Sequence, residues 1–175
     1  WWYTKSAGGG SLLDYLGYGV TLGTWFLDGR SPSEITTIAG GDSSLEVDEH
    51  SVTVARYGDD LSKFETRWGT FTDPWTHQPN PRCGFVLVGQ HGTIASWDYS
   101  DHVIVQTRDR PEPTEVPVDE LPKGRRGPVE YVIDCLEAGR RIEGCLDPAL
   151  SRIGQQIVDT ALLSASERKT VGLLR

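Results

Sequence analysis

The sequence predicts an α+β fold in which an open, mostly antiparallel or mixed β-sheet carries helices on one face. Three observations support this prediction. A helical pattern opens the chain, a series of strand-like segments with tight turns follows, and two further helical patterns close it. Helices at the two ends of a strand series favour segregated layers over alternating β–α units. An open sheet with apolar side chains on both faces commonly covers its second face in an oligomer.

The first helix is predicted to begin directly after the three glycines at residues 8–10. Ser11 follows them and can cap the helix, and Leu12 and Leu16 keep helical spacing. Gly17, Gly19 and Gly23 inside the helix lower its propensity by about 1 kcal/mol each relative to alanine, which favours a role in close packing against a neighbouring backbone. The turn sequence at residues 28–32 ends the helix.

Strands are predicted after this helix. Strand patterns cover residues 34–39, 51–57, 61–71, 84–88, 93–97 and 101–107. Turn signals at residues 58–60 and 89–92 separate neighbouring strands, as in hairpins. Residues 108–128 are polar and proline-rich, and we expect an extended surface connector there. Two helices are predicted at residues 128–139 and 147–166.

Composition excludes some functions. The formal charge of -8, from 25 acidic and 17 basic residues, disfavours nucleic-acid binding, which needs a basic footprint. No apolar run reaches the roughly 20 residues of a membrane span, and no secretory signal is visible. Cys83, Cys135 and Cys145 lack zinc spacing and predict buried, reduced thiols in a cytoplasmic protein. The scattered histidines give no support for a metal site.

Asp14 and Tyr18 are the candidate catalytic residues. Their spacing of four places both side chains on one face of the helix. A carboxylate there can orient a hydroxyl or accept its proton, and a phenol can donate or relay one. From spacing alone, an aspartate in a first turn is more often a partner of the helix dipole, and a tyrosine is more often a core or interface residue.

Two other groups of residues are candidates for binding. Gly9 and Gly10 permit positive φ and the close approach of a backbone or a ligand, but no strand precedes them, so they are not a dinucleotide fingerprint. Trp75 and His77 lie in a proline-rich loop with Trp68 nearby in sequence. Such residues can line a sugar pocket, or the loop packs on the sheet.

The segment at residues 8–19, GGGSLLDYLGYG, resembles the opening of the C-terminal domain of the Gfo/Idh/MocA oxidoreductases, with the pattern G-G-G-x-L-x-D-x-G-x-H. It is most similar to the glucose–fructose oxidoreductase branch, in which tyrosine replaces that histidine. Weaker similarity at residues 88–94, 135–140 and 158–173 extends the resemblance over nearly the whole chain. Leu16 and Thr21 depart from the family pattern, which leaves the choice of substrate open.

The resemblance implies that residues 1–175 are one α+β substrate-binding and oligomerisation domain, and that the family's N-terminal Rossmann domain is absent from them. It implies NAD or NADP as cofactor, bound mainly by that absent domain, with Gly9 and Gly10 as its contacts in this chain. The chain would then be half of an oxidoreductase that transfers hydride to or from a hydroxyl or carbonyl of a sugar or cyclitol, and would be inactive alone.

The resemblance also assigns roles. Asp14 and Tyr18 would face the substrate carbon that loses or gains hydride, with Tyr18 moving the hydroxyl proton and Asp14 holding substrate or tuning Tyr18. Lys5, Trp75 and His77 are the candidate contacts to a sugar-like molecule.

Two other functions stay open at this point. The chain can be a non-catalytic binding or assembly module whose sheet pairs with a partner chain, such as a second copy. It can also be a small pocket enzyme similar to a ketosteroid isomerase, with Asp14 as base.

Overall fold

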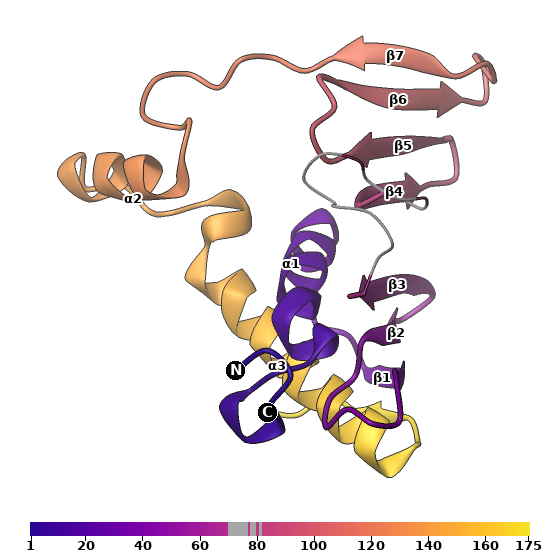
Figure 1. Cartoon of the computed structure of the whole chain (residues 1–175). Coiled ribbons are helices and arrows are strands. Elements are labelled where there is room, and N and C mark those ends of the chain that lie inside the picture. Colours follow the sequence, from indigo (N-terminus) through magenta and orange to yellow (C-terminus); the bar gives the residue numbers. More distant parts are fainter. Residues whose placement is uncertain (70–76, 78–79, 81) are drawn as a thin grey trace. The chain divides into compact units, whose positions relative to one another are not determined.

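The computed structural model describes residues 1–69, 77, 80 and 82–175 (Figure 1). They fall into two compact units, Trp1–Gly69 with Val132–Arg175, and Thr70–Tyr131. The first unit contains η1 (Lys5–Ala7), α1 (Ser11–Phe26), β1 (Glu34–Gly40), β2 (His50–Tyr57), β3 (Asp60–Arg67), η2 (Gly144–Leu146), α3 (Pro148–Glu167) and β8 (Val171–Gly172). The second contains β4 (Gly84–Val88), β5 (Gly92–Trp97), β6 (His102–Thr107) and β7 (Thr114–Pro117), and α2 (Pro128–Glu137) begins in the second unit and ends in the first.

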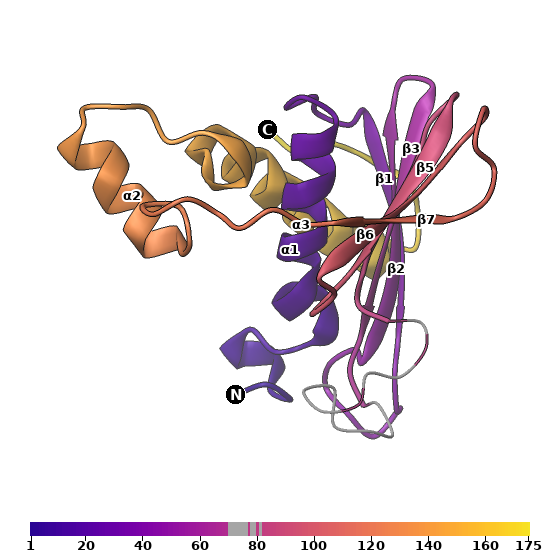
Figure 2. The same ribbon diagram turned by 90° about the horizontal axis from the view of Figure 1, so that it is seen from above.

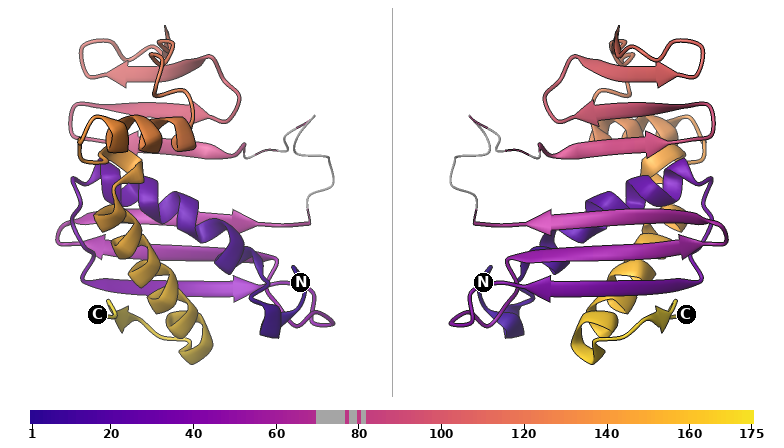
Figure 3. Two further views of the ribbon diagram at one scale, coloured as in Figure 1. Left: turned by 90° about the vertical axis from the view of Figure 1, so that its left-hand side faces the viewer. Right: turned by 90° about the vertical axis from the view of Figure 1, so that its right-hand side faces the viewer.

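The sheet of the first unit has the strand order β3-β2-β1-β8, and every pair is antiparallel. A tight turn at Gly58 and Asp59 joins β2 to β3, because Tyr57 pairs with Asp60 across it. Gly58 has a φ of 69°, which favours glycine at the first position of such a turn. Both long helices lie on one face of this sheet, with α1 over β2 and β3 and α3 over β1 and β8 (Figures 2 and 3).

The core of the first unit lies between this sheet and the two helices. Leu12, Leu16 and Val20 form one stripe of α1, and each is at most 1% exposed. They cluster with residues of α3 and the strands, namely Ile35, Ala55, Tyr57, Ile157, Val158 and Ala161. Burying a side chain of leucine size contributes about 1.5–3 kcal/mol. The stripe therefore decides which side of α1 faces the sheet.

Two glycines let α1 approach β3 closely. A Cβ on Gly23 would lie 2.9 Å from the ring of Phe64, and a Cβ on Gly19 would lie 3.2 Å from it. A Cβ on Gly17 would meet open space. Close packing is therefore found at Gly19 and Gly23, but against the Phe64 side chain and not against the predicted neighbouring backbone, and the prediction is wrong for Gly17.

The N-terminus of α1 is capped by a distant residue. Asp48 lies in the loop before β2, and its Oδ2 accepts hydrogen bonds from the backbone N–H of Leu12 at 2.8 Å and from the hydroxyl of Ser11 at 2.6 Å. A carboxylate at this end also interacts favourably with the helix dipole. The prediction that Ser11 caps the helix is wrong, because the N-cap residue is Gly10 and Ser11 is the first helical residue.

A chain of buried hydroxyls continues from this cap into the sheet. Ser11 Oγ lies 3.0 Å from Thr66 Oγ1, which lies 2.7 Å from Ser51 Oγ. A hydroxyl has a single hydrogen, and that of Ser11 is directed to Asp48. Thr66 must therefore donate to Ser11, and Ser51 must donate to Thr66. The chain satisfies buried polar groups of α1, β2 and β3, and its common direction strengthens each bond.

The second unit is an antiparallel sheet with the order β4-β5-β6-β7. The predicted hairpin between β4 and β5 is confirmed, and Gly89 N–H donates to the carbonyl oxygen of Gly92 at 2.9 Å. The connector predicted at residues 108–128 is wrong for Thr114–Pro117, which form β7. An edge strand pairs on one side only, so Pro117, which has no N–H, is tolerated there.

The predicted α+β class is confirmed, and the first unit has both long helices on one face of an open antiparallel sheet. The prediction of one sheet differs from the structure, in which the described strands form two four-stranded sheets. The organisation of residues 1–175 as one substrate-binding and oligomerisation domain stays a prediction. The expectation of buried cysteines holds for Cys135 and is wrong for Cys83 and Cys145, which are exposed.

We predict that Asp48→Ala lowers the free energy of unfolding by about 1–2 kcal/mol, the upper part of the range for a lost N-cap, because Ser11 also loses its acceptor. Urea unfolding of the chain followed by circular dichroism measures this. Asp59→Ala, in the exposed turn between β2 and β3, is the control and should change stability by less than about 0.5 kcal/mol. Equal stability of the two variants would contradict the role given to Asp48.

Candidate functional site

Asp14 and Tyr18 lie on the outward side of α1. Asp14 belongs to the first turn, where its N–H donates to the carbonyl oxygen of Gly10 at 3.0 Å, and its side chain is half-buried. Tyr18 follows one turn later and is 72% exposed. Its ring centroid lies 6.4 Å from that of Tyr15. Neither side chain belongs to the core, so the helix presents a carboxylate and a phenol at the surface.

Trp68, just beyond β3, contacts this carboxylate. Its indole Nε1–H donates to Asp14 Oδ2 at 3.3 Å. The backbone N–H of Trp68 donates to the carbonyl oxygen of Glu49 at 2.7 Å, which holds the residue beside the sheet. The two residues are 54 positions apart in the sequence, so no local sequence pattern predicts this hydrogen bond.

Two N-terminal aromatic residues complete the surroundings of Trp68. The ring of Trp2 stacks on Trp68 with centroids 6.0 Å apart, and Tyr3 meets Trp68 edge-on at 5.3 Å. Trp2, Tyr3 and Trp68 are named the aromatic cluster below. Sequence reasoning placed Trp68 beside Trp75 and missed Trp2 and Tyr3. The available signal was the Trp-Trp-Tyr run just before the glycines.

The predicted cofactor contacts, Gly9 and Gly10, are closely surrounded by the chain itself. A Cβ on Gly9 would lie 2.1 Å from the carbonyl oxygen of Trp2, and a Cβ on Gly10 would lie 2.6 Å from Asp48 Oδ1. Gly10 also has a φ of 115°, which a residue with a side chain rarely adopts. Glycine is therefore needed at these two positions, because Gly9 leaves room for the backbone of Trp2 and Gly10 leaves room for Asp48, which caps α1. Their contact with a cofactor stays a prediction.

The three predicted substrate contacts, Lys5, Trp75 and His77, do not all lie in the same unit of the described structure. Lys5 lies in η1 of the first unit with its side chain exposed, and its backbone N–H donates to Glu46 Oε2 at 3.2 Å. His77 is an exposed residue of the second unit. Trp75 lies outside the described residues. The structure thus places Lys5 in the same unit as Asp14 and Tyr18. The contact of Lys5, Trp75 and His77 with substrate stays a prediction.

A charged cluster lies on the opposite, uncovered face of the first sheet. Glu65 accepts a hydrogen bond from Arg67 at 2.9 Å and lies 3.1 Å from His50 Nε2 and 3.6 Å from the Lys63 ammonium. Partial burial raises the pKa of Glu65, but the hydrogen bond with His50 and the positive charges of Lys63 and Arg67 outweigh it, so the pKa lies below its ordinary value. Glu65 is therefore ionised at neutral pH.

Cys83 is exposed as a residue, but its thiol lies partly desolvated beside Asp98. Desolvation, followed by the hydrogen bond and negative charge of Asp98, raises the pKa of the thiol to about 11, which disfavours the nucleophilic thiolate. Within the described residues, no group of three or more histidine, cysteine, aspartate or glutamate side chains is placed to hold a metal ion. The described helices also include none long and apolar enough to span a bilayer. A cytoplasmic location stays a prediction.

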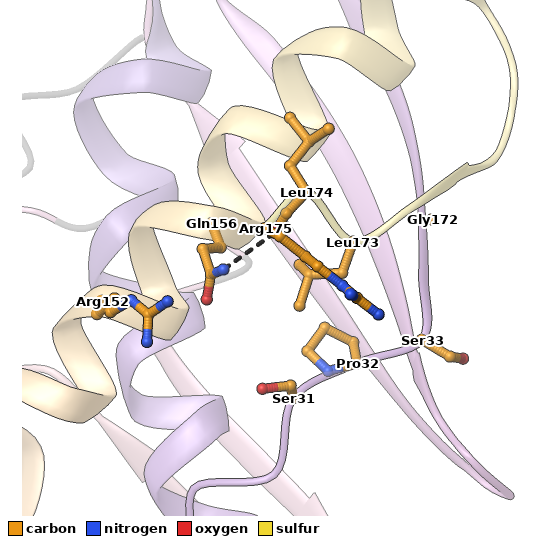
Figure 4. A pocket seen from close by; sticks show the side chains of 9 residues that line it. All are labelled: Ser31, Pro32, Ser33, Arg152, Gln156, Gly172, Leu173, Leu174 and Arg175. Atoms are coloured by element: carbon orange, nitrogen blue, oxygen red, sulfur yellow. Dashed lines mark hydrogen bonds between the residues drawn. The ribbon is translucent and has the colours of Figure 1, made fainter.

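A hollow of about 500 Å³ lies elsewhere in the first unit, between α3 and the segments before β1 and after β8 (Figure 4). It is lined by Ser31, Pro32, Ser33, Arg152, Gln156, Gly172, Leu173, Leu174 and Arg175. The amide of Gln156 donates to the carbonyl oxygen of Leu174 at 3.0 Å. The lining side chains offer hydrogen-bond donors but include no carboxylate or phenol. The hollow therefore lacks the proton-transfer groups that Asp14 and Tyr18 provide.

Comparison with known proteins gives a likeness in structure. No family model and no curated protein matches the chain. The structure of a levoglucosan dehydrogenase in complex with NADH and levoglucosan is similar with a TM-score of 0.72 and 18% identity, covering 100% of this chain and 53% of that one. An aldose–aldose oxidoreductase from Caulobacter crescentus, complexed with glycerol, has a TM-score of 0.74 and 18% identity, covering 99% of this chain and 50% of that one.

An NAD-binding protein from Listeria innocua is also similar, with a TM-score of 0.67 and 17% identity, covering 99% of this chain and 50% of that one. The chain thus spans about half the length of these proteins. At such identities the likeness establishes the fold, which is that of the C-terminal domain of Gfo/Idh/MocA-type oxidoreductases. The resemblance found in the glycine-rich opening is confirmed at this level.

Proposed function

We propose that the chain is the substrate-binding and oligomerisation half of an NAD(P)-dependent oxidoreductase that acts on a hydroxyl or carbonyl group of a sugar or cyclitol. The observation that carries the proposal is the placement of Asp14 and Tyr18, a hydrogen-bond acceptor and a proton donor one helical turn apart and outside the core. The fold supports it, because the similar structures include a levoglucosan dehydrogenase with NADH and an aldose–aldose oxidoreductase. The chain spans about half of each, so the activity of the whole protein is part of the proposal.

In this proposal Tyr18 donates or accepts the proton that accompanies hydride transfer. Reduction of a carbonyl adds hydride to carbon and a proton to oxygen, and the Tyr18 O–H donates that proton. In the oxidative direction the phenol oxygen accepts the proton of the substrate hydroxyl. The exposure of Tyr18 lets it exchange the proton with water.

Asp14 orients the substrate. Its carboxylate accepts a hydrogen bond from a sugar hydroxyl, and charge-assisted bonds of this kind are about twice as strong as neutral ones. Trp68 holds one oxygen of the carboxylate in place. The substrate is therefore positioned from a rigid element, the capped first turn of α1, and Tyr18 follows on the next turn.

NAD or NADP, when bound, supplies or accepts the hydride. The described residues of this chain do not form a nucleotide cradle of their own, because no strand precedes the glycines and the spaces beside Gly9 and Gly10 are filled by Trp2 and Asp48. We therefore assign cofactor binding mainly to a domain outside these 175 residues. Gly9 and Gly10 are then limited to backbone contacts with the cofactor.

The uncovered face of the first sheet supports the oligomerisation role. Ile38 and Leu61 project from this face and are 76% and 62% exposed, and Val54 lies between them on β2. The charged cluster around Glu65 carries both signs, so the same face of a second copy can meet it without net repulsion. An exposed apolar patch rimmed by charges is typical of a protein interface.

We predict that Tyr18→Phe lowers kcat/KM for hydride transfer by roughly 10²–10⁴, the range for a general acid–base group. Asp14→Asn should lower it by roughly 10–10², the size of a lost hydrogen bond to a charged group. The assay follows nicotinamide absorbance with the whole protein that contains this chain and a panel of sugars. Tyr99→Phe is a matched control, because Tyr99 is 75% exposed and lies in the turn after β5. Unchanged kcat/KM in both Asp14→Asn and Tyr18→Phe would refute the assigned roles.

We also predict that Ile38→Glu reduces the size of the assembled protein measured by light scattering, because a charge would be buried in the interface. Val129→Glu is the control, since Val129 is 71% exposed on α2 and projects from a helix. A clean monomer before any substitution, or an unchanged size in Ile38→Glu, would exclude assembly through this face.

A further inference from the structure

We propose that the aromatic cluster of Trp2, Tyr3 and Trp68 is a stacking surface for the ring of a pyranose sugar, with Asp14 at its edge. This inference rests on the proposed function and adds to it the residues that select a ring-closed sugar. The sequence grouped Trp68 with Trp75 as a candidate for lining a sugar pocket but assigned no role to Trp2 or Tyr3, and the comparisons assign none to any of the three.

The geometry of the cluster joins flat rings to a carboxylate. Trp68 lies at its centre, with Trp2 stacked on it at an interplanar angle of 28° and Tyr3 meeting it at 61°. The same indole donates its N–H to Asp14 at 3.3 Å. A ligand that contacts these rings is therefore within reach of the carboxylate as well.

The exposure of the cluster argues against a role in packing alone. Trp2 is 51% exposed and Tyr3 is 47% exposed, while Trp68 is half-buried. Aromatic side chains of this size dominate cores and binding surfaces when buried. None of these three belongs to the core cluster of the first unit. Large aromatic surface that stays in water next to a polar group is typical of a binding site.

Backbone hydrogen bonds hold the cluster in place. Gly10 N–H donates to the carbonyl oxygen of Trp2 at 3.1 Å, and Thr4 N–H donates to that of Trp1 at 2.9 Å. The absence of a side chain at Gly9 lets the Trp2 carbonyl come within 2.1 Å of where a Cβ would stand. Gly9 and Gly10 thus hold the N-terminal segment that carries the rings against the start of α1. A preorganised surface of this kind loses little conformational entropy on binding.

A pyranose fits this surface chemically. Its ring has an apolar face of C–H groups, which suits an aromatic plane, and hydroxyls around its rim, which suit a carboxylate. The Asp14 carboxylate has about four acceptor positions and gives one of them to Trp68. The others are able to accept from sugar hydroxyls. Trp68 is therefore both a contact for the ring and a positioning residue for Asp14.

The test measures binding by titration calorimetry with the whole protein that contains this chain. The probes are D-glucose, which is mostly a pyranose, and sorbitol, its reduced form, which has the same carbon chain and the same stereochemistry at C2–C5 but no ring. Stacking predicts that glucose binds more tightly than sorbitol. Trp2→Ala should raise the Kd for glucose by about fivefold to tenfold, the size expected for one aromatic contact, and should remove most of the preference over sorbitol.

Trp25→Ala is the matched control, because Trp25 is 45% exposed on the last turn of α1 and contacts Phe26 outside the cluster. Its Kd for glucose should stay within about twofold of the unaltered protein. The hydrogen bond at Trp2 uses its backbone oxygen, so Trp2→Ala keeps it. Trp2→Phe, which retains a smaller ring, should give an intermediate Kd and provides a second variant if Trp2→Ala unfolds.

Trp68→Phe separates positioning from stacking. The phenyl ring keeps most of the contact but removes the N–H, so KM should change little while kcat falls severalfold, and Trp2→Ala should show the reverse. Equal Kd values for Trp2→Ala, Trp2→Phe and Trp25→Ala would overturn the stacking surface. If the unaltered protein still turns over a sugar in that case, the proposed function stands. Absence of any sugar binding or turnover in the unaltered protein would overturn both.

Discussion

The carboxylate of Asp48 at the start of α1 is the interaction on which the rest of the site depends. It accepts hydrogen bonds from the N–H of Leu12 and the hydroxyl of Ser11, and it ends a directed chain of hydroxyls that reaches Thr66 and Ser51 in the sheet. One group therefore satisfies the helix terminus and ties α1 to both β2 and β3. Asp14 stands on the turn that this cap fixes.

The polar core and the glycines act together in placing that turn. Hydroxyl pairs between helix and strand bring the two backbones closer than leucine-sized side chains would, and Gly19 and Gly23 remove side chains where Phe64 approaches. The apolar stripe of Leu12 and Leu16 then decides which side of α1 is buried. Asp14 and Tyr18 lie outside this stripe, so burial of the stripe decides on which side of α1 they stand.

The sequence predicts elements whose cause is local. The bounds of α1, the turn between β2 and β3 and the hairpin between β4 and β5 follow from side-chain spacing and turn residues only a few positions apart. Contacts between distant residues are different. Asp48 lies 36 residues from Leu12, and Trp68 lies 54 residues from Asp14. No periodicity encodes such pairs, so the cap was assigned to Ser11 and the partner of Asp14 was missed.

The edge strand β7 shows the same limit in the second unit. Prolines around it favour a connector by local rules, yet pairing with β6 on one side is sufficient to form a strand. The glycine-rich opening gave the family resemblance because its residues are contiguous, and the structure supports that resemblance at the level of fold. The structural reason for Gly9 and Gly10, which is room for Trp2 and Asp48, is visible only in three dimensions.

The most direct measurement is a crystal structure of the whole protein that contains this chain, grown with NADH and a sugar that it turns over. The proposed function predicts a sugar whose reacting carbon faces the nicotinamide, with one hydroxyl bonded to the Asp14 carboxylate and the reacting oxygen within hydrogen-bond distance of the Tyr18 phenol. A sugar bound productively at the nicotinamide but remote from both side chains would contradict it.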